Sequence, residues 1–365
     1  MKPSSCPVHA ASHLLLRWLR TAALGVLTCS ANVPVLGDAL APSPNPGRRD
    51  TSFPTLNGVS FLEGLYIAVG DDGTLLTRVP GGVWQQRVSG VEIRLNAVAY
   101  GAGWYVAVGD EGVILLSRDG IRWERCFAGI AENLKGILYA RGRFVAVGAG
   151  GAIVVSRDAH RWEWRNSGVT TELRSIADDG GQLVVVGAYR TFLVSSDGDG
   201  WTKALPSACP GFYGVIPVRE AFWIAGCDGL IRSVTEDGGA WSHGLISSLG
   251  PVFAVTGDDR GYVAAGPHGT LFTSPDGALW RPCPWATSKP LWGLATGTDG
   301  FVAVGAGGVT LHSADGRTWK RTGIEWLPRS MAAVLPRDCR ASAVRPRRQR
   351  ASGWRASSDR RRATT

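Results

Sequence analysis

The sequence predicts an all-β fold, a seven-bladed β-propeller built from four-stranded antiparallel blades. Two markers recur along the chain with one period: seven tryptophans spaced 39 or 40 residues apart, and seven glycines that each end an apolar segment. Repeats of about 40 residues are typical of propeller blades. The tryptophans are Trp84, Trp123, Trp162, Trp201, Trp241, Trp280 and Trp319, and the glycines are Gly70, Gly109, Gly148, Gly187, Gly226, Gly266 and Gly305.

Each repeat divides into four short segments separated by turn residues. In residues 95–132 the segments are LNAVAY, WYVAVG, VILLS and RWERCF, and the turns are GAG, DEG and RDG. Such segments have the length of strands and alternate in polarity, whereas helical repeats need apolar residues at three- and four-residue spacing. The 49 glycines also disfavour helices, because an interior glycine costs about 1 kcal/mol there.

Seven evenly spaced repeats predict one closed ring, since an open array would leave unpaired sheets at both ends. Residues 56–60 supply the first strand of repeat 1, and residues 318–323 supply the last strand of repeat 7. We therefore expect blade 7 to pack on blade 1, helped by residues near Thr51. Residues 330–334 begin 11 residues after Trp319, where an eighth first strand would start. They are either the remnant of an eighth blade or a strand that docks on the ring.

The predicted organisation is a signal peptide (1–37), a Pro-rich linker (38–54), the propeller (55–328) and a basic tail (329–365). Arg17 and Arg20 precede an apolar core at residues 21–31 that is too short to span a bilayer. We expect export to the periplasm or the extracellular space, with no transmembrane span after cleavage. An uncleaved apolar segment is the alternative. A lipid anchor on Cys29 is disfavoured, because Thr28 is large for the residue before a lipidated cysteine.

The net charge of +9 is concentrated in the tail, where residues 329–365 hold eleven arginines and two acidic residues. Residues 51–328 hold 23 basic and 26 acidic groups, so no nucleic-acid partner is expected for the propeller. The tail is poor in apolar residues and is predicted to be disordered. It either contacts an anionic lipid, cell-wall polymer or nucleic acid, or is a solvated segment without a partner.

A second motif, S-x-D-G-x-x-W, precedes the tryptophans. Serine and aspartate side chains bond to nearby backbone groups, so the motif predicts a tight structural turn. Repeat 1 has Pro80 in place of the aspartate, and repeat 3 has Ala159 in place of the glycine. Recurrence in six turns indicates architecture rather than one catalytic or calcium site. The structural aspartates are Asp119, Asp158, Asp197, Asp237, Asp276 and Asp315.

This turn resembles the Asp-box, or bacterial neuraminidase, repeat. Together with apolar segments such as AVGDEGVI, it makes residues 56–324 look most like the photosystem II stability/assembly factor family. The resemblance implies a propeller and, by analogy, a partner that is a membrane-protein assembly intermediate. A sialidase would need an arginine cluster, a tyrosine nucleophile and six blades, so the resemblance does not imply that activity.

No catalytic motif, metal-ligand spacing or cofactor motif is found, which predicts a non-enzymatic protein without a cofactor. The cysteines suggest one crosslink. Cys126 and Cys283 occupy the same slot in non-adjacent repeats and are not expected to pair. Cys209 and Cys227 fall at the same end of blade 5, where they form a disulfide if the protein is exported, or remain free buried thiols.

The strongest candidate for a functional site is the mouth of the central channel. The second residue of each first strand varies, whereas the next residue is always small, which lets the inner strands converge. The turns after the marker glycines share this end, including Asp71-Asp72 and Asp110-Glu111. The candidate binding residues are Asn57, Asn96, Lys135, Arg174, Tyr213, Phe253 and Trp292 on the strands, and Tyr189, Arg190, Asp110, Asp228 and His268 on the turns.

This mouth is acidic and amide-bearing over blades 1 and 2, basic over blades 3 and 4, and aromatic over blades 5 to 7. Such a surface suits a protein or peptide partner of a monomeric assembly scaffold. The alternative is a carbohydrate-binding or carbohydrate-active propeller, for which Asp110 and Asp228 are the nearest carboxylate pair. A third interpretation is drift at solvated positions, with the aromatic residues packed between blades.

Overall fold

The computed structural model describes residues 53–204, 211–218, 221–233, 241–242, 250–327 and 339–340. The chain divides into two units, Met1–Asp50 and Thr51–Thr365, and all described residues belong to the second. Among them, no helix has both the length and the apolar character needed to cross a membrane. The predicted signal peptide, all of the linker before residue 53, residues 330–334 and most of the tail lie outside the described residues.

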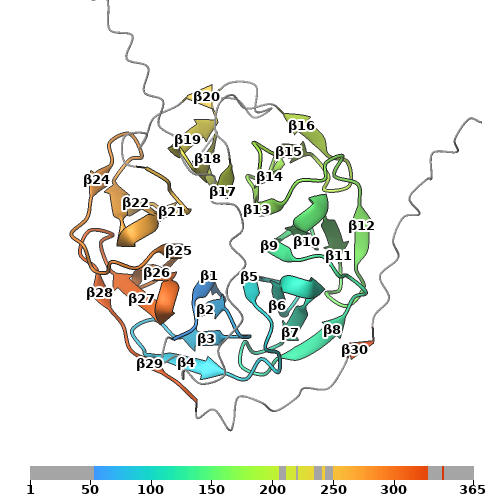
Figure 1. Ribbon diagram of the computed structural model, residues 1–365, viewed down its shortest axis with the longest axis horizontal. Helices are drawn as coiled ribbons and strands as arrows, with labels where there is room; N and C mark the ends of the chain where they lie inside the picture. Colours follow the sequence, from blue (N-terminus) through green and yellow to red (C-terminus); the bar gives the residue numbers. More distant parts are fainter. Residues whose placement is uncertain are drawn as a thin grey trace, which may run out of the picture. The chain divides into compact units, whose positions relative to one another are not determined.

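The strands of the described residues form seven sheets set around a central axis (Figure 1). Within each sheet, four strands follow one another in chain order and pair antiparallel, which confirms the all-β propeller with four-stranded blades. Blade 1 consists of β1 (Leu56–Leu62), β2 (Leu65–Gly70), β3 (Leu75–Arg78) and β4 (Trp84–Arg87); blade 2 of β5 (Leu95–Gly101), β6 (Trp104–Gly109), β7 (Ile114–Ser117) and β8 (Glu124–Phe127); blade 3 of β9 (Leu134–Ala140), β10 (Arg143–Gly148), β11 (Ile153–Ser156) and β12 (Glu163–Arg165); and blade 4 of β13 (Leu173–Asp178), β14 (Leu183–Gly187), β15 (Phe192–Ser195) and β16 (Thr202–Ala204).

The second half of the ring repeats this arrangement. Four short 3-10 helices occur in the described part of the chain, each in a turn between the second and third strands of a blade. Blade 5 consists of β17 (Phe212–Val218), β18 (Ala221–Gly226), β19 (Gly229–Ser233) and β20 (Trp241–Ser242); blade 6 of β21 (Ala254–Asp258), β22 (Gly261–Ala265), β23 (Leu271–Ser274) and β24 (Arg281–Pro282); and blade 7 of β25 (Leu291–Gly297), β26 (Gly300–Gly305), β27 (Val309–Ser313) and β28 (Lys320–Arg321). The 3-10 helices are η1 (Asp110–Gly112), η2 (Ala149–Gly151), η3 (Pro267–Gly269) and η4 (Ala306–Gly308).

The core lies between the blades. Among the side chains that the structure describes, seven clusters of buried apolar residues each join two neighbouring blades, and one of them joins blade 7 to blade 1. In that cluster Val302 and Val304 pack with Leu56, Tyr66 and other residues of blade 1. Because a sheet must bury its apolar faces, each blade needs a neighbour on both sides, and a closed ring satisfies all of them.

Ring closure combines this packing with a strand pair. The inner strands contact one another in a cycle that ends with β25 against β1, as the sequence analysis expects. In addition, β29 (Ile324–Glu325) pairs in parallel with β4 on the outside of blade 1, and Phe53 stacks on Trp326 with ring centroids 5.3 Å apart. A second added strand, β30 (Cys339–Arg340), pairs in parallel with β8 on the outside of blade 2.

A buried polar cluster reinforces the junction of blades 7 and 1. Asp299, from the β25–β26 turn, accepts hydrogen bonds from the Tyr66 hydroxyl (2.5 Å), the Arg78 guanidinium (2.7 Å) and the Gly81 amide (2.9 Å). Arg78 is only 3% exposed. The turn of repeat 1, which has Pro80 instead of an aspartate, therefore receives its carboxylate from the neighbouring blade.

The other described motif turns have the predicted bonds. In repeat 2, Asp119 Oδ1 accepts from the amides of Ile121 (2.8 Å) and Arg122 (2.9 Å), and the Trp123 indole donates to the Gly120 carbonyl (3.1 Å). Amide donors stabilise the ionised form, and those of Gly200 and Asp199 lower the pKa of Asp197 to about 2. The carboxylates of Asp158, Asp276 and Asp315 make similar bonds, and Asp237 lies outside the described residues.

Candidate functional site: the channel mouth

A β-bulge places the variable residue at the start of the inner strands. In blade 1, Leu56 pairs with Gly70 and Gly58 pairs with Val69, so Asn57 is the extra residue. A bulge redirects the side chain of the extra residue, which explains why these positions form a ring of their own. The same irregularity is found at Asn96, Lys135, Arg174, Tyr213 and Trp292, and Phe253 directly precedes β21.

The marker glycines hold this bulge in place. The Asp71 amide, next to Gly70, donates to the Thr55 carbonyl at 2.8 Å, and a Cβ on Gly70 would lie 2.1 Å from that oxygen. Gly109 has an extended backbone (φ −153°), so the glycine is required for space rather than for an unusual φ. Equivalent close approaches to the carbonyl before the inner strand occur at Gly109, Gly148, Gly187, Gly266 and Gly305.

The small residue after each bulge allows the blades to converge, as the sequence analysis expects. A Cβ on Gly58 would lie 2.5 Å from the Asn96 carbonyl oxygen of blade 2, and one on Gly136 would lie 2.9 Å from that of Arg174 in blade 4. The backbone of the next blade therefore occupies the space that a side chain would need.

Over blades 1 to 3 the ring is a network of amides and charges. Asn57 donates to Asp71 (3.0 Å) and to the Leu95 carbonyl of the next blade (3.1 Å). Asn96 repeats this pattern one blade later with Asp110 (2.8 Å), and the ammonium of Lys135 lies 2.7 Å from the same carboxylate. These residues are half-buried, so the polar sector is ordered by bonds between blades.

From blade 4 to blade 7 the ring is a continuous stack. The Arg174 guanidinium is held by Glu172 (2.7 Å) and lies 5.1 Å from the centre of the Tyr213 ring. Tyr213 meets Phe253 edge to face at 5.3 Å, and Phe253 stacks on Trp292 at 4.4 Å with an interplanar angle of 16°. Trp292 is 39% exposed. We call these residues, Arg174, Tyr213, Phe253 and Trp292, the aromatic ladder.

The turn residues of the prediction lie farther out on the same end. Tyr189 is 81% exposed and, with Arg190, has a positive φ of 50° to 59°. Asp228 and His268 are also exposed. The structure joins Asp110 to the ring by the hydrogen bonds given above, but no comparable bond joins Tyr189 or His268 to it among the described residues.

The predicted disulfide is not tested by this structure. Cys227 carries a thiol 3.4 Å from the Tyr213 hydroxyl, and Cys209 lies outside the described residues. The pairing of Cys209 with Cys227 stays a prediction. Cys126 and Cys283 are buried between different pairs of blades, and burial raises the pKa of the Cys283 thiol to about 11.

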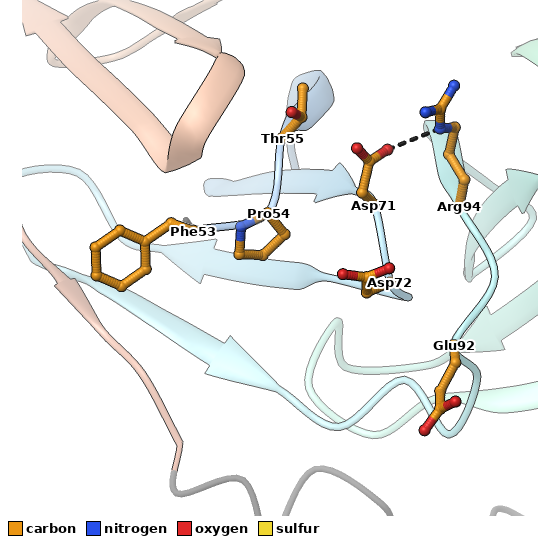
Figure 2. Close-up of a pocket in the computed structure, with 7 residues that line it drawn as sticks. All are labelled: Phe53, Pro54, Thr55, Asp71, Asp72, Glu92 and Arg94. Atoms are coloured by element: carbon orange, nitrogen blue, oxygen red, sulfur yellow. Dashed lines mark hydrogen bonds and ion pairs between the residues drawn. The ribbon is translucent and has the colours of Figure 1, made fainter. Parts of the chain in front are cut away.

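A cavity of about 340 Å³ opens at the blade 1 side of the mouth (Figure 2). In Figure 2, Arg94 reaches from the segment before β5 to Asp71, which it contacts at 2.7 Å. Sequence reasoning missed Glu92 and Arg94, although Thr55, Arg94, Asn133 and Glu172 share one repeat offset just before the inner strand. The lining residues are Phe53, Pro54, Thr55, Asp71, Asp72, Glu92 and Arg94.

The described residues do not bring metal-binding groups together. No cluster of three or more histidine, cysteine, aspartate or glutamate side chains with the arrangement of a metal site is found among them. Asp110 lies over blade 2 and Asp228 over blade 5, and these blades are not neighbours. The mouth thus consists of the polar network over blades 1 to 3 and the aromatic ladder over blades 4 to 7.

Comparison with known proteins relates this architecture to other propellers. No family model matches the chain, and no curated protein matches it. YCF48 from Cyanidioschyzon merolae is similar in structure, with a TM-score of 0.59 and 20% identity over 73% of this chain and 96% of that chain. A structure of YCF48 bound to D1 peptide has a TM-score of 0.61 and 18% identity over 71% and 91%. The WD40 propeller domain of Doa1 has a TM-score of 0.56 and 13% identity over 70% and 91%. At these identities, the likeness shows that the chain shares the β-propeller fold.

Proposed function

We propose that this chain is an exported, monomeric and non-enzymatic propeller that binds a protein or peptide segment at the channel mouth. The aromatic ladder carries the proposal, because it ends in the exposed face of Trp292 and begins at the charged Arg174. Tryptophan, tyrosine and arginine are the residues that most often dominate binding energy at protein interfaces. Preformed stacking also reduces the entropy lost when a partner docks.

The similar structure of YCF48 with D1 peptide supports a peptide as the partner, since it shows a propeller of this architecture in a peptide complex. By analogy with the photosystem II stability/assembly factors, the finer proposal is a scaffold that holds a membrane-protein assembly intermediate. This role takes place in the periplasm or outside the cell and needs no cofactor and no nucleic acid.

The test is selection of peptides from a displayed random library on the purified full chain, followed by affinity measurement for the enriched peptides. Tyr213→Ala/Trp292→Ala should weaken binding by at least about tenfold, because two central aromatic contacts are lost. A second pair, Lys135→Ala/Arg174→Ala, tests the basic sector. Equal affinities of the wild type and both pairs would exclude the mouth as the site.

A matched control comes from the opposite face of the ring. Ile121 and Leu279 are exposed apolar residues in the motif turns of blades 2 and 6, 45% and 70% exposed. Ile121→Ala/Leu279→Ala removes similar apolar surface without touching the mouth, so binding of the selected peptides should stay within about twofold of the wild type.

Carbohydrate binding is the second candidate, because the Trp292 face lies one blade away from the amide and carboxylate of Asn57 and Asp71. A glycosidase needs two carboxyl groups about 5 to 10 Å apart. Asp110 and Asp228 belong to non-adjacent blades, and Asp110 is paired with Lys135, so a lectin fits the mouth better than a hydrolase. A glycan array without bound sugars, together with no turnover of model glycosides, would exclude both.

A further inference from the structure

We propose that the C-terminal segment of this chain, residues 341–365, docks on its own channel mouth and competes there with the partner. The proposal rests on the proposed function only in taking the mouth as the binding surface. The direction of the chain, the charge of the mouth and the composition of the segment each support it.

The last described strand runs toward the mouth. β30 lies beside β8 on the outside of the ring (Figure 1). The two strands pair in parallel, with Cys339 opposite Cys126 and Arg340 opposite Phe127. β8 leads into the loop that carries Asn133, whose side chain accepts a 2.9 Å hydrogen bond from the amide of Glu111 in the mouth turn η1. Because β30 has the same direction as β8, its C-terminal residue, Arg340, lies at the end of the strand that faces the mouth side of blade 2.

This side of the mouth is acidic. The cations Arg94 and Lys135 are each engaged, 2.7 Å from Asp71 and from Asp110 respectively. Three further carboxylates are exposed and have no ion-pair partner among the described residues; they are Asp72, Glu92 and Glu111. The mouth over blades 1 and 2 therefore carries negative charge that this part of the chain does not neutralise.

The composition of residues 341–365 complements this surface. The segment has eight arginines, one acidic residue (Asp359) and one aromatic residue, Trp354, which is followed by Arg355. Arginine forms forked bonds to carboxylates and also stacks on aromatic rings, so it suits both sectors of the mouth. Trp354 matches the exposed face of Trp292 at the end of the aromatic ladder.

The segment is also long enough. Fully extended, the 14 residues from Arg340 to Trp354 span about 45 Å. The distance from β30 to the inner strand β5 is only about 19 Å, because this sheet has five strands and adjacent strands lie about 4.8 Å apart. At an effective concentration of about 1 mM, a tail with a Kd of about 0.1 mM would lower the apparent affinity for a partner about tenfold.

The experiment uses the full chain with a benzophenone amino acid in place of Trp354. After irradiation, we expect cross-links within one chain to peptides that carry the cavity residues or Trp292. Asp72→Asn/Glu92→Gln should reduce their yield at least about threefold, because the carboxylates that hold the arginines are removed. The matched control, Glu63→Gln/Asp259→Asn, removes two exposed charges in β1–β2 and β21–β22 turns and should leave the yield unchanged.

Cross-links confined to the motif-turn face would overturn the proposal. A yield that is insensitive to Asp72→Asn/Glu92→Gln would do the same. So would cross-links between chains, which a mixture of isotopically light and heavy protein reveals. No partner is present in this experiment, so docking of the tail can fail while selected peptides still bind the mouth, and the two failures are distinguishable.

Discussion

The two ends of the ring are built on the same strands but by different means. At the motif-turn end, side chains hold the backbone in place: Asp119 and its described equivalents each accept hydrogen bonds from amides of their own turn. At the mouth, the backbone makes it: the close approach of Gly70 to the Thr55 carbonyl fixes the bulge whatever side chain Asn57 carries. The motif turns therefore need the same residues in every repeat. The bulge positions at the mouth tolerate different side chains, so they can acquire a function.

The largest expected effect lies at the motif turn of repeat 1, which receives its carboxylate from Asp299 of blade 7. Asp299→Asn should lower the free energy of unfolding by about 3 to 5 kcal/mol, because it leaves the buried Arg78 charge without its partner. Urea unfolding measures the change. Asp258→Asn, which affects the more exposed pair with Arg260, is the control and should cost less than about 1 kcal/mol. Equal losses of unfolding free energy in Asp299→Asn and Asp258→Asn would show that the Asp299 carboxylate has no special role.

Gly58→Ala tests whether the close approach between the backbones of neighbouring blades determines the structure of the mouth. The added Cβ would lie 2.5 Å from the Asn96 carbonyl, so blades 1 and 2 must separate, at a cost of about 1 to 3 kcal/mol. Gly64→Ala provides a control for added volume, since no atom lies within 4 Å of that Cβ, although its positive φ of 77° adds a cost of about 1 kcal/mol. Unfolding of Gly58→Ala at the wild-type urea concentration would contradict the close approach.

The motif turns should make the fold sensitive to acid. Amide bonds from Thr318 and Arg317 lower the pKa of Asp315, and the pKa of Asp197 is about 2. Since the unfolded pKa is about 4, the contribution of these groups is complete above pH 4 and is lost as the pH falls toward 2. Asp315→Asn should cost about 1 kcal/mol at pH 7 and show a smaller loss of Tm between pH 4 and pH 2 than the wild type. If the Tm of Asp315→Asn and of the wild type fell equally between pH 4 and pH 2, the motif-turn aspartates would be excluded as the origin of acid sensitivity.

The smallest effect on stability is expected at the mouth. Asp72→Asn/Glu92→Gln should change the free energy of unfolding by less than about 0.5 kcal/mol, because both side chains are exposed and the bulge does not depend on them. Urea unfolding of this pair beside Gly58→Ala gives the comparison directly. A cost above 1 kcal/mol would mean that the acidic sector serves the fold.

Much of the candidate site could be predicted from the repeat alone. Asn57, Lys135 and Trp292 were grouped because they share one repeat slot, and the structure places them on one ring. The bulge at that slot could not be predicted, because it depends on the register against the second strand. Sequence reasoning missed Glu92 and Arg94 because they lie in the segment between β4 and β5. Arg94 does occupy a repeat position just before the inner strand, but the residues at that position share no common chemical character.

The sequence by itself determined the all-β class and the size of the blade, because a 39-residue period of turns and apolar segments permits few other folds. It also determined the motif turns, whose partners lie within a few residues. Only the tertiary structure decided the contacts between residues far apart in the sequence. Asp299 completes the motif turn of repeat 1, and β29 pairs with β4. The aromatic ladder likewise brings together residues from four blades. Such contacts depend on which surfaces meet when the ring closes, and closure is a property of the whole chain rather than of any one repeat.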